Sequence, residues 1–328
     1  MMRIIPQSDV ERLMPVHACV PVMRDCMMAT SRRDVTLPIR QFMPVPDYPG
    51  KLAIMPGTLG DPACFGIKLV CKYERPHGDP LGTHVGMVML FDSEKGVPLA
   101  MIEGSSLTAI RTSAASALAT DLLARKDSRR LAIIGNGEQA IRHIHAMRAV
   151  RDIDHVTVWG RDPERAAAFA QAAAAETSIE VQTAATAADA VRGADIICTT
   201  TSAKQPVLSG ADLHNGQHIN LVGSAIPTTA EVDTAAVAKS KFYVDYREAA
   251  LAAAGELLAA IKQGAVTESH IAGEIGKVAD GQLSGRQDDA EITMYKSLGV
   301  ASQDLAAAHA IWLAAEQENS GTQVDLLA

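Results

Sequence analysis

Apolar and polar positions alternate with a period of two in the first third of the chain. This pattern predicts strands at residues 64–73, 83–91 and 97–102, the last two joined as a hairpin around residues 92–96. Prolines are frequent in residues 37–57, so we expect only strand edges and loops there. Residues 36–102 are therefore expected to be mainly strand, with antiparallel connections.

Apolar residues recur at helical spacing in three other segments. Residues 8–30 are predicted to be helical with a break near Pro15, and the last predicted helix covers residues 302–318. A third predicted helix covers residues 105–124, and Arg111 falls on its apolar stripe. A charged side chain on a buried helix face needs a partner, so we expect Arg111 to be paired.

From residue 130 onward, short apolar runs alternate with amphipathic stretches. The predicted strands are residues 131–134, 155–159, 179–182, 195–199, 218–222 and 241–244. Strands interleaved with helices in this way predict an α/β fold with a doubly wound parallel sheet of Rossmann type. Beyond residue 247 the pattern is helical, with breaks at glycines.

A glycine-rich turn follows the first of these strands and opens an amphipathic helix. Its sequence is Gly135-Asn136-Gly137-Glu138-Gln139-Ala140. Gly135 allows a tight turn, and Gly137 allows a ligand to approach the backbone closely. The positive end of the helix dipole then favours a pyrophosphate, which predicts a dinucleotide bound by Gly135, Gly137, Glu138 and Gln139. The alternative is that the turn serves packing alone.

Other cofactor-binding residues are expected where the parallel strands end. Ligands of doubly wound sheets lie at the carboxyl ends of the strands, which nominates Thr200, Thr201 and Ser224. The second strand ends with Gly160-Arg161-Asp162. Glycine and arginine leave room and charge for a 2′-phosphate, so Arg161 favours NADP, with NAD possible. In the alternative interpretation, Arg161 is a solvated loop residue paired with Asp162.

Composition narrows the class of protein. The 328 residues suggest about two domains, and 48% hydrophobic residues with a net charge of −8 indicate a globular protein with no reason to bind nucleic acid. No apolar run is long enough to suggest a membrane partner, and we expect a cytoplasmic location. The five cysteines lack metal-ligand spacing, so we expect buried reduced thiols and no metal site.

Two basic residues in the strand-rich part are ambiguous from the pattern alone. In residues 64–73, Lys68 lies on the face opposite an apolar row, which favours solvent exposure over a role in a site. Arg40 lies in an extended segment directly after Pro38 and Ile39. The sequence pattern therefore does not decide whether Lys68 and Arg40 lie on the surface or in a binding site.

Several stretches together resemble the ornithine cyclodeaminase/mu-crystallin family. They span most of the chain in the family's order, and the Ala-Ile-Arg-Thr and Lys-Ser-Leu-Gly pieces are fairly specific. The matching stretches are Phe65-Gly66-Ile67-Lys68, Thr83-His84, Leu107-Thr108-Ala109-Ile110-Arg111-Thr112-Ser113-Ala114, Ile133-Ile134-Gly135-Asn136-Gly137-Glu138-Gln139-Ala140 and Glu291-Ile292-Thr293-Met294-Tyr295-Lys296-Ser297-Leu298-Gly299.

The resemblance implies a Rossmann domain, residues 116–299, inserted in a mixed α+β domain, residues 1–115 plus 300–328, that binds substrate and forms a homodimer through strands. It also implies that Arg40, Lys68 and Arg111 surround the carboxylate of a small imino or oxo acid substrate. Thr83 and Ser297 would lie near the nicotinamide end of the cofactor. Lys68 could polarise or protonate the reacting nitrogen.

One departure from the family pattern concerns the reaction. Cyclodeaminases resemble one another in an aspartate and a lysine after the fifth strand, where this chain has Ala225 and Thr229. Neither side chain can accept a proton from an ammonium group. We therefore expect an NAD(P)H-dependent imine reductase or amino-acid dehydrogenase that reduces a small 2-imino acid or cyclic ketimine. The alternatives are a cyclodeaminase-like lyase with tightly bound NAD and a non-catalytic NADPH-binding protein.

Overall fold

The computed structural model describes residues 1–75, 79 and 81–326. The chain forms two compact units: Met1–Arg111 with Val300–Ala328, and Thr112–Gly299. The change from the first unit to the second falls inside helix α3 (Gly104–Leu123), and the sequence-predicted boundary at residues 115 and 116 lies in the same helix. The two units are described separately below.

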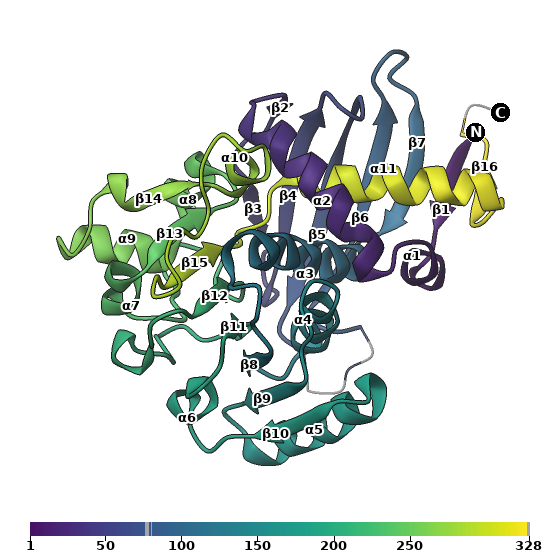
Figure 1. Cartoon of the computed structure of the whole chain (residues 1–328). Coiled ribbons are helices and arrows are strands. Elements are labelled where there is room, and N and C mark those ends of the chain that lie inside the picture. The colour runs from purple at the N-terminus through teal and green to yellow at the C-terminus, as the bar shows by residue number, and fades with distance from the viewer. Residues whose placement is uncertain (76–78, 80, 327–328) are drawn as a thin grey trace. The chain divides into compact units, whose positions relative to one another are not determined.

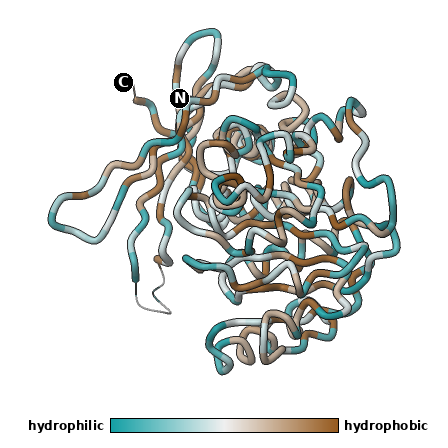
Figure 2. The backbone as a smooth tube through the Cα atoms, turned by 90° about the vertical axis from the view of Figure 1, so that its left-hand side faces the viewer, coloured by the Kyte–Doolittle hydropathy of each residue, from teal (hydrophilic) through white to brown (hydrophobic). Residues whose placement is uncertain are grey.

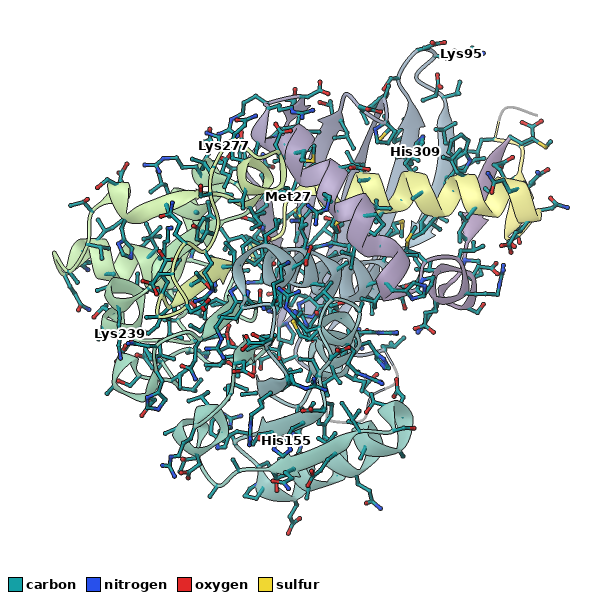
Figure 3. All side chains as sticks on the ribbon, viewed as in Figure 1. Met27, Lys95, His155, Lys239, Lys277 and His309 are labelled. Carbon is teal, nitrogen blue, oxygen red and sulfur yellow. The ribbon has the colours of Figure 1, made fainter. Side chains whose placement is uncertain are left out.

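The described strands of the first unit form one eight-stranded sheet in the order β16-β1-β7-β6-β5-β4-β2, with β3 also paired to β4. Strands β1 and β7 are parallel, and the other neighbours are antiparallel. The strands are β1 (Met2–Ile5), β2 (Val35–Thr36), β3 (Gln41–Pro44), β4 (Gly50–Leu59), β5 (Cys64–Tyr73), β6 (His84–Asp92), β7 (Pro98–Glu103) and β16 (Thr322–Val324). The predicted hairpin is confirmed, and Lys95 lies at its turn (Figure 3).

Helices of the first unit include α1 (Gln7–Leu13), α2 (Val16–Ser31) and α11 (Ala301–Glu318). The predicted break near Pro15 is confirmed, because Pro15 is the N-cap of α2. Helix α11 packs against α2 and on strands β4, β5 and β6, as Figure 1 shows. The last helix of the chain therefore completes the N-terminal unit.

The prediction of only strand edges and loops in residues 37–57 is wrong. Strand β4 is ten residues long and pairs with β5 along its whole length. On its other side, β3 pairs with residues 51–54 and β2 with Thr58 and Leu59. Pro56 falls between these two ladders, so a residue without an N–H group is accommodated in a long inner strand.

In the second unit, the described strands form one parallel sheet in the order β10-β9-β8-β11-β12-β15-β13-β14. The predicted α/β fold with a Rossmann-type parallel sheet is confirmed. The strands are β8 (Arg130–Ile134), β9 (His155–Trp159), β10 (Glu180–Thr183), β11 (Ile196–Thr199), β12 (His218–Leu221), β13 (Lys241–Val244), β14 (Ile271–Glu274) and β15 (Thr293–Lys296).

The prediction of a purely helical pattern beyond residue 247 is wrong, because β14 and β15 belong to the sheet. Strand β15 lies between β12 and β13, and all four of its residues are buried. Its sequence, Thr-Met-Tyr-Lys, contains only one aliphatic side chain. The polar residues Thr293 and Lys296 are tolerated inside because they find partners elsewhere in the unit, Arg286 and Glu256, which a local pattern does not reveal.

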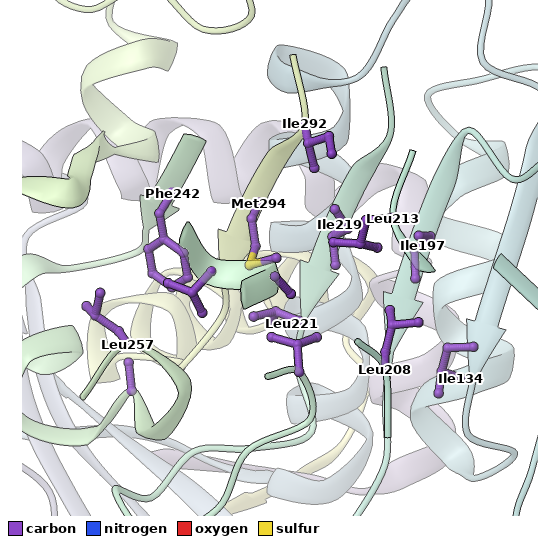
Figure 4. Packing of buried hydrophobic residues seen from close by; sticks show 14 of the residues in the cluster. Ile134, Ile197, Leu208, Leu213, Ile219, Leu221, Phe242, Leu257, Ile292 and Met294 are labelled. Carbon is purple, nitrogen blue, oxygen red and sulfur yellow. The ribbon is translucent and has the colours of Figure 1, made fainter. Parts of the chain in front are cut away.

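Helices connect the parallel strands, and their apolar sides pack on the sheet. They are α4 (Glu138–Arg148), α5 (Pro163–Thr177), α6 (Ala187–Val191), η1 (Gly210–Asp212), α7 (Thr234–Lys239), α8 (Arg247–Ala253), α9 (Gly255–Lys262), η2 (Glu268–His270) and α10 (Ile275–Ala279). Figure 4 shows Ile197, Ile219 and Met294 of neighbouring strands in one apolar layer with Leu257 of α9. In Figure 2, hydrophobic stretches of the backbone alternate with more hydrophilic turns.

Two further expectations concern the whole chain. The five cysteines are free, and four of them are buried, as predicted, with Cys71 exposed. Within the described residues, no helix combines the length and apolarity that crossing a bilayer requires.

Candidate functional site

A buried cluster of charged side chains lies in the first unit. Lys68, at the middle of β5, donates a hydrogen bond from Nζ to Oδ1 of Asp304 on α11, at 2.9 Å. Lys68 is 3% exposed and Asp304 is 0% exposed. The ion pair is therefore shielded from solvent, where each charge depends strongly on its partner.

Arg111 of α3 joins the same carboxylate. Its Nε donates to Oδ1 of Asp304 at 2.9 Å, and its NH1 donates to Oε1 of Gln303 at 2.9 Å. Gln303 in turn donates from Nε2 to the sulfur of Met27, which Figure 3 labels on α2. Asp304 is thus the partner that the position of Arg111 on an apolar stripe predicts.

The cluster carries more positive than negative charge. Lys68 and Arg111 share one carboxylate oxygen, and Arg40, directly before β3, adds a positive charge near enough to lower the pKa of Lys68. Oδ2 of Asp304 is buried and has no hydrogen-bond partner among the described residues. Excess positive charge in a dry site favours an anionic ligand such as a carboxylate.

Burial sets the proton affinity of the cluster. Desolvation lowers the pKa of Lys68 to about 8, Arg111 and Arg40 act in the same direction, and Asp304 opposes them. Burial alone would raise the pKa of Asp304, but Arg111 and Lys68 hold it below its ordinary value. Lys68 is therefore mainly protonated at pH 7 but close to the point at which it releases its proton.

The expectation that Lys68 is solvent-exposed is wrong. On β5, Cys64, Gly66 and Lys68 are the buried residues, whereas Phe65 and Ile67 are only partly buried. Helix α11 packs on the face that holds Lys68, and a Cβ atom at Gly66 would lie 2.8 Å from Leu305 of that helix. The apolar row is thus the less buried face of the strand.

The glycine-rich turn lies between β8 and α4 in the second unit. Gly135 has φ of +120°, and a Cβ atom there would lie 2.8 Å from Oγ1 of Thr200, so only glycine fits. Gly137 is the N-cap of α4, and a Cβ atom on it would meet nothing within 4 Å. Open space in front of the helix N-terminus is what a pyrophosphate requires.

The neighbouring strand ends hold the other nominated residues of this unit. Thr200 donates from its backbone N–H to the carbonyl of Ile134 at 2.8 Å. Thr201 donates from both N–H and Oγ1 to Glu231, and Ser224 donates from Oγ to the carbonyl of Thr229 at 2.7 Å. Thr201 and Ser224 are thus held by residues of the segment that follows β12.

The segment after β9 separates Arg161 from Asp162. Asp162 is the N-cap of α5, and its Oδ1 accepts hydrogen bonds from the N–H groups of Glu164 and Arg165. Arg161 is exposed and makes no ion pair with any described residue. Of the alternative interpretation, the solvated loop position of Arg161 agrees with its exposure, but the expected ion pair with Asp162 does not form.

The last two residues nominated for cofactor binding are Thr83 and Ser297. Thr83 lies directly before β6, where its Oγ1 is 2.8 Å from Nδ1 of His84. Ser297 follows β15, is 3% exposed, and its Oγ has no hydrogen-bond partner among the described residues. Oε1 of Gln139 is also buried without such a partner. These two orphaned atoms and the open space at Gly137 fit a polar cofactor.

The described residues offer no comparable set of ligands for a metal ion. In the part of the chain that the structure describes, no group of three or more His, Cys, Asp or Glu side chains could hold one.

Sequence reasoning missed Gln303, Asp304 and Glu231. Asp304 falls in the first turn of α11, where it follows Ser302 and Gln303 and precedes the apolar run that begins at Leu305. The argument that assigns a partner to Arg111 applies equally to this carboxylate. Glu231 lies in a loop, and no periodic pattern marks it.

Comparisons with known proteins identify the family of this chain. A profile of the Ornithine cyclodeaminase/mu-crystallin family matches residues 2–319. The Delta(1)-pyrroline-2-carboxylate reductase of Bacillus cereus is 36% identical over 327 residues, 99% of this chain and 100% of that protein. The ketimine reductase mu-crystallin of Mus musculus is 34% identical over 278 residues, 85% of each protein.

A solved structure is similar over almost the whole chain. It is the Thermococcus litoralis Delta(1)-pyrroline-2-carboxylate reductase in complex with NADH and L-proline. The TM-score is 0.94 at 33% sequence identity, covering 98% of this chain and 100% of that one. The profile match and these relatives confirm the predicted resemblance, including its reductase branch. The chain belongs to the ornithine cyclodeaminase/mu-crystallin family.

Proposed function

We propose that this protein reduces the C=N bond of a small 2-imino acid or cyclic ketimine, using NADPH or NADH. The observation that carries this proposal is the buried, net positive cluster of Lys68, Arg111 and Asp304, with Arg40 beside it. A carboxylate next to the imine carbon supplies the negative charge that this cluster lacks. The names of the reductase relatives support the same reaction.

The roles of the side chains follow from their chemistry. Arg111 and Arg40 bind the substrate carboxylate, and Lys68 donates a hydrogen bond or a proton to the imine nitrogen. When bound, the nicotinamide cofactor supplies the hydride that goes to the imine carbon. A hydride and a proton together convert C=N to CH–NH, so the product is an amino acid. Much of the cluster's contribution is orientation of the reacting carbon.

Residues of the second unit are proposed to hold the cofactor. Gly135, Gly137, Glu138 and Gln139 cradle the pyrophosphate, and Thr200, Thr201 and Ser224 line the ends of the strands. Ser297 of this unit, together with Thr83 of the first unit, is assigned to the nicotinamide end. The orphaned hydroxyl of Ser297 supports its assignment.

The first experiment is a spectrophotometric screen. Oxidation of NADPH and NADH is followed with cyclic ketimines, and with 2-oxo acids plus ammonia or methylamine. We expect oxidation with at least one carboxylate-bearing imine and one amino acid formed per cofactor oxidised. Ammonia release without net cofactor change would instead indicate a lyase, and cofactor binding without turnover would indicate a sequestering protein.

The lyase alternative lacks the side chains that it needs. Ala225 and Thr229 stand where the cyclodeaminase pattern has an aspartate and a lysine. The Oγ1 of Thr229 lies 2.8 Å from the Oγ of Ser224, so the Thr229 hydroxyl is already hydrogen-bonded. A methyl group and an engaged hydroxyl cannot accept a proton from an ammonium group.

The pH profile is expected to report Lys68. As pH rises through about 8, Lys68 loses its proton, so kcat/KM falls on the alkaline side. In Lys68→Arg the guanidinium stays charged, so this alkaline limb should disappear whatever the absolute rate. Measuring kcat/KM from pH 6 to 10 tests this expectation. A limb near pH 8 that persists in Lys68→Arg assigns the titration to another group.

We propose a preference for NADPH over NADH. Asp162 caps α5, so its carboxylate is not the ribose-binding acid that selects NAD, and Arg161 is free to meet a 2′-phosphate. Arg161→Ala should therefore raise the Kd for NADPH ~10-fold and leave that for NADH unchanged. Arg165→Ala, on the exposed side of α5, is the matched control. Equal effects of Arg161→Ala on both cofactors would refute the preference.

We also propose a homodimer that forms through the sheet of the first unit. Five apolar side chains that point away from α11 on β4–β7 are incompletely buried: Ile54, Ile67, Met87, Met89 and Met101. An apolar sheet face of this kind marks an interaction surface.

Free cysteines agree with a reducing compartment, which supports a cytoplasmic location.

Light scattering tests the dimer. We expect the mass of two chains for the wild type and of one chain for Met89→Glu, because a charge would be buried in the contact. Lys95→Glu, at the turn between β6 and β7, should leave the mass unchanged. A wild-type mass of one chain would refute the proposal.

A further inference from the structure

A fully buried carboxylate joins two strand ends of the parallel sheet. Oε1 of Glu231 accepts hydrogen bonds from the N–H and the Oγ1 of Thr201, at 2.7 and 2.8 Å. Its Oε2 accepts from Oγ1 of Thr199 at 2.8 Å, and from the N–H groups of Gly223 and Ser224 at 2.7 and 3.3 Å. A single side chain therefore fixes the backbone after β11 and after β12.

A buried ion pair extends this arrangement to a third strand. Lys296, at the end of β15, lies 3.1 Å from Oε2 of Glu256 on α9 and donates to the carbonyl of Ser224 at 2.5 Å. Oε1 of Glu256 accepts from the backbone N–H of Glu231 at 3.1 Å. Glu231 and Lys296 are 0% exposed and Glu256 is 1% exposed. The two carboxylates and one ammonium are thus linked through Ser224 and the backbone of Glu231.

The backbone at this point has no spare room. A Cβ atom at Gly223 would lie 2.0 Å from the carbonyl oxygen of Thr201 and 2.5 Å from Oε1 of Glu231. The two strand-end loops therefore touch each other with Glu231 between them. Such close packing, with charged hydrogen bonds, holds a loop in one conformation.

We propose that Glu231, supported by the ion pair of Glu256 and Lys296, is a positioning residue for the cofactor. It holds Thr201 and Ser224, together with Thr200 between the fixed residues Thr199 and Thr201, in the arrangement that binds the nicotinamide half of the dinucleotide. The carboxyl ends of adjacent parallel strands are where such sheets bind ligands. The inference rests on the proposed function only in taking these loops as cofactor-binding.

The test is the cofactor affinity of Glu231→Gln. The amide has nearly the same shape, but its NH2 group faces N–H donors of Thr201 or Gly223, so at least one hydrogen bond is lost and one loop is released. We expect the Kd for NADPH, measured by fluorescence titration of folded protein, to rise ~10-fold. The KM for the imino acid should change less than ~2-fold, since the carboxylate-binding cations belong to the other unit.

Asp195→Asn is the matched control. Asp195 also bridges two strands through backbone N–H groups, accepting from Arg129 at 2.9 Å and Arg130 at 3.0 Å. It lies at the amino ends of β8 and β11, away from the ligand edge of the sheet. Both variants should melt at a lower temperature than the wild type, but only Glu231→Gln should lose cofactor affinity. Equal Kd values for the two variants would overturn the proposal.

A milder variant keeps the test decisive if Glu231→Gln does not fold. Thr199→Val removes only the hydroxyl that donates to Oε2, and it should raise the Kd for NADPH ~3-fold. An unchanged Kd in Thr199→Val would then overturn the proposal. A wild type that binds NADPH but reduces no imine refutes the proposed function and leaves these Kd comparisons intact.

Discussion

Replacing Lys68 by methionine is expected to lower kcat/KM for a 2-imino acid by about a thousandfold and to leave cofactor affinity within about twofold of the wild type. Methionine keeps the length of the side chain but removes its charge and its three donors. Asp304 retains Arg111 as a partner, at 2.9 Å, so the fold is expected to persist. Steady-state kinetics with NADPH and a cyclic ketimine, and fluorescence titration with NADPH, measure the two effects.

Lys72→Met provides the matched control for this variant. Lys72 lies four residues further along the same strand and the same face, but it is exposed. Its replacement should leave kcat/KM almost unchanged. A Lys68→Met enzyme as active as the Lys72→Met enzyme would show that Lys68 has no part in the reaction.

Replacing Asp304 by leucine is expected to lower the free energy of unfolding by ~3–5 kcal/mol, because two buried cations lose their shared counter-charge. Asp304 is 0% exposed and accepts from both Lys68 and Arg111. Urea unfolding followed by circular dichroism measures the loss. Glu318→Gln, at the exposed end of the same helix, should cost little, because its ion pair with Arg12 is solvated.

A double variant tests the cause of this loss. Lys68→Met in the Asp304→Leu background removes one of the two unpaired cations, so part of the stability should return. If the double variant is less stable than Asp304→Leu alone, lost packing rather than unpaired charge explains the effect.

Since the pKa of Asp304 is below its ordinary 3.8, the contribution of this ion pair to stability is present above about pH 4 and lost only as pH falls further.

The second unit could be predicted from the sequence better than the first. Most of its strands from β8 to β13 are short apolar runs, and the glycine turn at Gly135 has a local signature. Strand β15 was missed because Lys296 ends it, and the lysine is buried only because Glu256, forty residues away in the sequence, pairs with it. Local periodicity carries no record of such a partner.

The site in the first unit shows the same limit. Arg111 could be singled out because a cation on an apolar helix stripe needs a counter-charge. Lys68 could not, because alternation along β5 separates two faces without saying which one α11 covers. Once Asp304 is seen between them, both cations are explained by one carboxylate.

The dependence of the reaction on the substrate carboxylate tests the central claim most directly. The measurement compares kcat/KM for a cyclic imine that carries a 2-carboxylate with kcat/KM for the same ring without it. Binding of the carboxylate by Arg111 and Arg40 predicts a ratio of at least about a thousand. A ratio near one would contradict the account, because the buried positive cluster would then contribute nothing to the choice of substrate.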